Sequence, residues 1–130
     1  MKLSLRLLLF PALLCMLAFA GCSGKGDNPK PTSHKIKYRA EVSSGSTIHT
    51  VIYIAASGEN TTLSNLNVGT WESQEFNLPA STGAVSLAVV GTSANTSATM
   101  KVQIIVDGVV KKESTATGGT SFGASATFYF

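Results

Sequence analysis

The sequence predicts an all-β domain, an immunoglobulin-like antiparallel β-sandwich of about seven strands, over residues 35–130. Three observations indicate this class. Apolar residues occupy every second position in several runs, as in strands with one buried face. Turn-forming residues separate those runs at short intervals, and no segment after residue 34 has the 3.6-residue periodicity of an amphipathic helix.

The first two strands are expected on either side of a polar turn. Residues 35–42 alternate charged and apolar side chains, which places Ile36, Tyr38, Ala40 and Val42 on one face. Residues 43–46 have turn composition. Residues 47–56 carry β-branched side chains on both faces, so we expect this second strand in the interior of a sheet.

The middle of the chain predicts two short strands followed by two core strands. Residues 61–67 form the first short strand, and residues 70–78 form the second, which ends at Pro79 because proline has no amide hydrogen to donate. Residues 84–90 and 99–106 each place alternate large apolar side chains on one face, so both are expected to line the core.

The last strands are joined by the strongest turn signal in the chain. Asp107-Gly108 is typical of a type I′ hairpin, which needs positive φ at both central residues. The returning strand is expected over residues 109–117, with a break at Gly118-Gly119. A final strand over residues 121–130 repeats apolar residues with period two.

The amino-terminal residues resemble the signal peptide and lipobox of a bacterial lipoprotein. Lys2 and Arg6 form a basic start, residues 7–20 are largely apolar, and the dipeptide Ala-Gly precedes Cys22. The apolar run is short for crossing a bilayer. An ordinary secretory signal and an uncleaved membrane anchor are the alternative interpretations.

The lipoprotein resemblance implies that residues 1–21 are cleaved as a signal peptide and that Cys22, lipidated with acyl chains such as palmitate, becomes the first residue. Two or three chains hold a protein durably at a membrane, at about 0.8 kcal/mol per buried CH2. The expected partner of the lipidated Cys22 is then the membrane. The protein is expected to be lipid-anchored in the cell envelope. Ser23 in place of aspartate favours the outer membrane in an organism with two membranes.

Residues 22–34 are predicted to form a flexible tether, because they contain almost no apolar side chain and include two prolines. Cleavage would remove Lys2 and Arg6, which leaves eight basic against seven acidic residues, a net charge of about +1. This balance excludes a nucleic-acid partner. Because Cys15 lies in the predicted signal and Cys22 carries lipid, no thiol remains for a disulfide.

The residues that could carry chemistry are few and scattered, so we expect no catalytic residue, metal site or cofactor and predict that the protein is not an enzyme. His34 is assigned to the tether, and His49, near the start of a strand, to the surface or the rim of the core. Glu72 and Glu75 are the closest acidic pair, but residues three apart on a strand point to opposite faces unless a bulge intervenes. A small hydrolase is therefore the least favoured hypothesis.

Trp71 is the one tryptophan of the chain and the only ligand-binding candidate. With Tyr53, Phe76 and Tyr129 it could form either a core anchor or an exposed platform on which sugar or lipid stacks. A single tryptophan in a small sandwich is more often a core anchor.

The second half of the domain is similar to the MmpS family. The likeness lies in residues 99–113, which contain Val106-Asp107-Gly108-Val109, in the glycine pair that follows, and in residues 51–78, in which a tryptophan precedes Leu78-Pro79. The resemblance implies a membrane-anchored extracytoplasmic β-sandwich that assists a lipid-exporting transporter. This chain departs from the family in having a lipid tether in place of a transmembrane helix and in lacking a terminal cysteine pair.

Taken together, the sequence predicts a membrane-anchored bacterial envelope lipoprotein, a non-enzymatic binding or transport-accessory module with an envelope or transporter protein as partner. The alternative is a carbohydrate- or lipid-binding surface module that uses Trp71.

Overall fold

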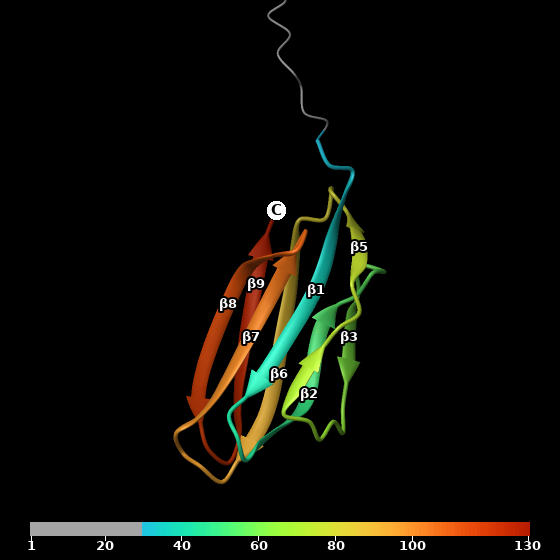
Figure 1. Ribbon diagram of the computed structural model, residues 1–130. Helices are drawn as coiled ribbons and strands as arrows, with labels where there is room; N and C mark the ends of the chain where they lie inside the picture. The colour runs from blue at the N-terminus through green and yellow to red at the C-terminus, as the bar shows by residue number, and fades with distance from the viewer. Residues whose placement is uncertain (1–29) are drawn as a thin grey trace, which may run out of the picture. The chain divides into compact units, whose positions relative to one another are not determined.

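The structure is a computed structural model that describes residues 30–130 (Figure 1). The predicted signal peptide, Cys22 and most of the predicted tether lie outside the described residues. Residues 30–130 form nine strands, and this part of the chain contains no helix long and apolar enough to cross a membrane.

The nine strands form two antiparallel sheets. Sheet A has the order β4-β1-β7-β8, with β5 also paired to β1, and sheet B has the order β3-β2-β6-β9. The strands of sheet A are β1 (Ser33–Val42), β4 (Thr70–Glu72), β5 (Phe76–Pro79), β7 (Ala98–Val106) and β8 (Val109–Gly118). Those of sheet B are β2 (Ser46–Ile54), β3 (Asn60–Leu63), β6 (Ala84–Ser93) and β9 (Phe122–Tyr129).

The predicted two-sheet antiparallel sandwich is confirmed, with nine strands where about seven were expected. β1 and β2 are consecutive but lie in different sheets, and so do β6 and β7, as Figure 1 shows. Immunoglobulin constant domains order their strands ABED and CFG. The likeness to them therefore lies in the two-layer architecture, and the strand order differs.

The core consists of the apolar residues that occur at every second position of the long strands. The inward side chains of β6 and β7 are fully or almost fully buried, as are Ile36, Tyr38 and Ala40 of β1, while Val42 at the end of β1 is partly buried. On β9 the inward residues Phe122, Ala124 and Ala126 are buried, while Phe130, beyond the end of the strand, is 40% exposed. Burial of this apolar surface between the sheets is the main force that stabilises the sandwich.

Two predicted local features are confirmed by the backbone. β2 lies between β3 and β6, as expected for an interior strand. Asp107 and Gly108 have φ values of 52° and 79°, so both centres of the β7–β8 hairpin adopt the positive φ that a type I′ turn requires.

The strand predicted over residues 70–78 is divided, and this division accounts for one of the additional strands. Ser73 lies between β4 and β5, where its hydroxyl oxygen accepts the amide hydrogen of Tyr38 at 2.9 Å and its own amide donates to the Tyr38 carbonyl at 3.0 Å. Ser73 thereby satisfies both backbone groups of Tyr38. The chain can leave the regular ladder there and rejoin β1 as β5.

Candidate functional site

The charged residues of the strands all lie in sheet A. The residues concerned are Lys35, Lys37, Arg39 and Glu41 on β1, Glu72 on β4, Lys101 on β7, and Lys111, Lys112 and Glu113 on β8. The four strands of sheet B contain no lysine, arginine, aspartate or glutamate. The sandwich thus has one strongly charged sheet and one uncharged sheet.

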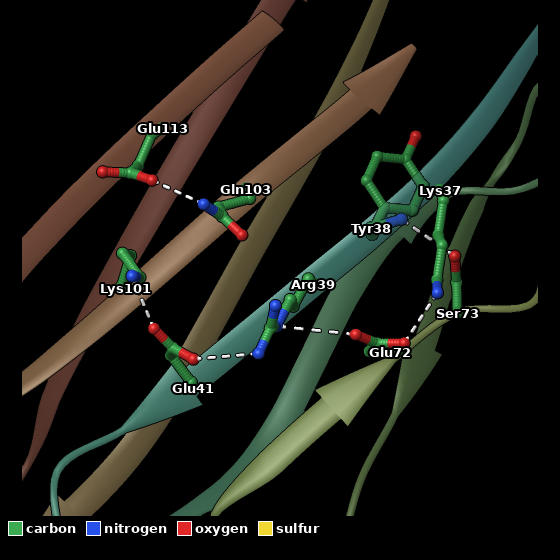
Figure 2. Close-up of polar contacts among 9 residues, drawn as sticks. All are labelled: Lys37, Tyr38, Arg39, Glu41, Glu72, Ser73, Lys101, Gln103 and Glu113. Atoms are coloured by element: carbon green, nitrogen blue, oxygen red, sulfur yellow. Dashed lines mark hydrogen bonds and ion pairs between the residues drawn. The ribbon is translucent and has the colours of Figure 1, made fainter. Parts of the chain in front are cut away.

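On the outer face of sheet A, opposite charges on neighbouring strands form a continuous row (Figure 2). Lys37 Nζ lies 2.7 Å from Glu72 Oε2, and Arg39 Nε lies 3.4 Å from Glu72 Oε1. Arg39 also contacts Glu41 at 3.3 Å, and Glu41 contacts Lys101 Nζ at 2.6 Å. Each carboxylate in the row therefore contacts two cations.

The row shifts the pKa values of Glu41, Glu72 and Lys101 in the direction that keeps these groups charged. The hydrogen bond from Lys101 lowers the pKa of Glu41, and the hydrogen bond from Lys37 lowers that of Glu72. The same Glu41 contact raises the pKa of Lys101. These groups have partners already, so the row has the character of a surface ion-pair ladder that stabilises strand pairing modestly.

Glu72 and Glu75 reach the same face, because the uninterrupted strand that would point them to opposite faces is not formed. Glu75 Oε1 lies 3.4 Å from Lys35 Nζ, and Glu72 contacts Lys37, so both carboxylates reach lysines that alternate on the same outer face of β1. The reason is the break at Ser73, since the two glutamates do not belong to one continuous strand. Each carboxylate is nevertheless engaged with a lysine rather than with the other carboxylate.

A shallow groove of about 350 Å³ lies beside this row, near the end of β1. Glu41 and Lys101 line it together with the hydroxyl-bearing side chains of Thr70, Thr99 and Thr115. The two charged groups are paired with each other. Among the described residues, no buried side-chain nitrogen or oxygen atom lacks a hydrogen-bond partner, so the groove contains no unsatisfied buried group directed at a ligand.

The outer face of sheet B carries no lysine, arginine, aspartate or glutamate from its strands. Its exposed residues on β9 are Gly123, Ser125, Thr127 and Tyr129, and β6 contributes Val90, which is 43% exposed. Ile52 on β2 is 38% exposed and pairs with Ala88, which lies two residues before Val90 on β6. An uncharged face with exposed apolar side chains is the kind of surface that protein partners cover.

His34 lies in a strand, so its predicted place in the tether is wrong. β1 begins at Ser33, two residues before the predicted start, and His34 Nδ1 lies 2.8 Å from Asp107 Oδ2. The ring stacks on Phe130 with centroids 4.7 Å apart. Asp107 Oδ1 also accepts the amide hydrogen of Lys35, so this cluster joins the start of β1, the β7–β8 hairpin and the end of the chain.

His49 uses both ring nitrogens to hold the structure together. It lies at a register shift between Ile48 and Thr50 of β2. Its Nε2 is 2.7 Å from the Thr92 hydroxyl, and its Nδ1 is 3.2 Å from the Leu66 carbonyl oxygen. A carbonyl can only accept, so Nδ1 carries the hydrogen in this arrangement. The described residues contain no cluster of His, Cys, Asp and Glu that could hold a metal ion.

Trp71 is partly buried and packs against the core from β4, opposite Ala40 of β1. Its ring lies 5.4 Å from that of Tyr53 at an angle of 47°, and Tyr38 contacts both Tyr53 and Phe76. Tyr129 is 74% exposed on the outer face of sheet B and takes no part in this cluster. Three of the four aromatic residues considered together are thus close in space, and the fourth is not.

A scan of the chain against models of known protein families finds no match, and a search of the curated proteins returns no match either. The resemblances to lipoproteins and to the MmpS family therefore stay predictions.

We did not predict from the sequence that one sheet would be charged and the other uncharged, although the sequence contains a signal for it. Segments 46–54, 60–63, 84–93 and 122–129 lack Lys, Arg, Asp and Glu. Nothing in the sequence showed that these four segments would pair with one another. Their grouping depends on strand order, which the local pattern does not encode.

Proposed function

We propose that this chain is a lipid-anchored, non-enzymatic binding module of the bacterial cell envelope, whose sandwich is held at a membrane through Cys22. The observation that carries the proposal is the apolar run that ends in Ala-Gly-Cys22 after a basic start. The sandwich supports it, because each carboxylate of the ion-pair row and each ring nitrogen of His49 already has a structural partner.

The uncharged outer face of sheet B gives this module a surface suited to a protein partner. Charged residues are depleted in the centres of protein interfaces, and aromatic residues are enriched there. Sheet B has no charged side chain in its strands and exposes Tyr129. A role as an accessory to an envelope transporter, which the MmpS resemblance implies, is the finer form of this proposal.

Membrane partition of two cysteine variants tests the anchor. Cys22→Ser removes the acceptor of the lipid, so the variant should lose metabolic labelling with a palmitate analogue and should no longer be recovered with the lipidated membrane fraction. Cys15→Ser is the matched control, because it removes a cysteine from the predicted signal and leaves Cys22 in place. Equal labelling of Cys22→Ser and the parent chain would contradict the proposal.

A further inference from the structure

We propose that the free edge of β9 pairs antiparallel with β9 of a second copy of this chain, about a two-fold axis that passes between the two Ser125 residues. The pairing would join the two copies of sheet B into one continuous sheet. This inference goes beyond the proposed function and does not depend on the lipid.

β9 is the terminal strand of sheet B and offers a regular hydrogen-bonding edge. It pairs only with β6, through eight consecutive residue pairs without a register shift. In an antiparallel ladder alternate residues direct their N–H and C=O groups to opposite sides. Every second residue of β9 therefore presents these groups to the open side, as a template for another strand.

The other edges of the sandwich carry features that oppose such pairing, and β9 does not. β8, the edge strand of sheet A, contains Lys111, Lys112 and Glu113, and its register with β7 shifts near Ile105. β3 and β4 have only four and three residues, and β5 ends in Pro79. Charge, register shifts, short length and proline all protect edges from added strands. β9 has eight residues and none of these features.

The sequence of β9 indicates that the added strand is β9 itself. From Phe122 to Phe128 it reads Phe-Gly-Ala-Ser-Ala-Thr-Phe, which is nearly the same in both directions about Ser125. Antiparallel pairing with Ser125 facing Ser125 would put Phe122 opposite Phe128, Ala124 opposite Ala126, and Gly123 opposite Thr127. A strand of unrelated sequence would not place like residues opposite one another in this way.

The symmetric register also keeps each side chain on its proper face. Phe122, Ala124 and Ala126 are buried on the core side, whereas Ser125 and Thr127 are exposed on the outer side. Because strand side chains alternate with period two, a shift by one residue would place buried residues opposite exposed ones. In the proposed register core residues face core residues, and every facing pair is uncharged.

Disulfide trapping in the purified full chain tests this register. In the proposed pair the two Ser125 Cα atoms lie about 4.5–5.5 Å apart, which is within the range of about 4.4–6.8 Å that a disulfide spans. The two Thr127 residues are offset by about 14 Å along the strands, at about 3.4 Å per residue. Ser125→Cys should form a disulfide-linked dimer on mild oxidation, whereas Thr127→Cys, also exposed on β9, should not exceed the parent chain.

Sedimentation provides a second measurement that needs no new thiol. The parent chain should sediment as a dimer, and Ser125→Lys should sediment as a monomer, because it places two like charges opposite each other. Thr117→Lys, on the exposed outer face of β8, is the matched control and should remain dimeric. A monomeric parent chain, or equal trapping through residues 125 and 127, would overturn the proposal.

Discussion

The carboxylate of Asp107 joins the β7–β8 hairpin to the start of β1 through both of its oxygen atoms. One oxygen contacts His34, and the other accepts the amide hydrogen of Lys35. The hydrogen bond with His34 is the main cause that lowers the pKa of Asp107, and the Lys35 amide adds to it. A carboxyl group whose pKa is lowered by folding stabilises the folded state wherever it is ionised in the unfolded chain.

This linkage predicts an acid sensitivity. The contribution of Asp107 is present above its unfolded pKa, near pH 4, and is lost as the pH falls through the lower folded-state pKa. Asp107→Asn should therefore show a smaller loss of stability between about pH 5 and pH 2 than the parent chain, measured by urea unfolding at each pH. Asparagine tolerates positive φ, so the turn is kept.

Glu59→Gln is the control for that series, because the Glu59 side chain has no ion pair within the described residues. It should reproduce the acid profile of the parent chain. An acid profile of Asp107→Asn that coincides with both would show that the His34 contact contributes nothing to folding.

Trp71 gives a second measurement at the scale of a residue, because it is the one tryptophan and all indole emission reports on it. Its packing on Tyr53 and against the core predicts partial shielding from a soluble quencher and no change in emission when glycans or short-chain lipids are added. A saturable emission shift with either ligand would favour the alternative of a carbohydrate- or lipid-binding module that uses Trp71.

Among single residues, the sequence predicted those that follow a simple local rule. The positive φ at Asp107 and Gly108 was predictable, because a two-residue hairpin requires it. The position of His34 was not predictable, because its partners are Asp107 and Phe130, far away in the chain. Polar segments adjoining a domain can be held by such long-range contacts, which composition does not reveal.

At the scale of an element, β6 depends on a glycine where it approaches β2. A methyl group at Gly91 would collide with the carbonyl oxygen of Thr47 and would lie 2.9 Å from Met100 Cε. Gly91→Ala should lower the free energy of unfolding by about 1–3 kcal/mol, the usual cost of overpacking. Urea unfolding of the variant measures this loss.

Gly83→Ala is the matched control for this prediction. Gly83 immediately precedes β6, and a methyl group there would have no heavy atom within 4 Å. Its unfolding midpoint should stay close to that of the parent chain. Equal midpoints for the two alanine variants would contradict the close approach between β6 and β2.

The long strands were predictable because one face of each is buried and the apolar pattern has a clear period. β1, β6, β7 and β9 begin and end within three residues of their expected bounds. The division between β4 and β5 was not predictable, since it rests on the bonds that Ser73 makes with Tyr38 in another strand. Edge strands have one neighbour only, so local contacts of this kind can interrupt them.

For the whole molecule, strand order separates the charges into one sheet and leaves the other uncharged. Sheet A carries the ion-pair row that Figure 2 shows, and sheet B ends in β9, with its open and nearly symmetric edge. The sequence predicted the two-layer class but not this separation, because the same strands in another order would mix charged and uncharged segments in each sheet.

The proposed lipid anchor at Cys22 is tested most directly by the mass of the amino-terminal peptide of the mature protein. We expect a peptide that begins at Cys22 and carries the added mass of two or three acyl chains. A mature chain that begins elsewhere, or a Cys22 with an unmodified thiol, would contradict it.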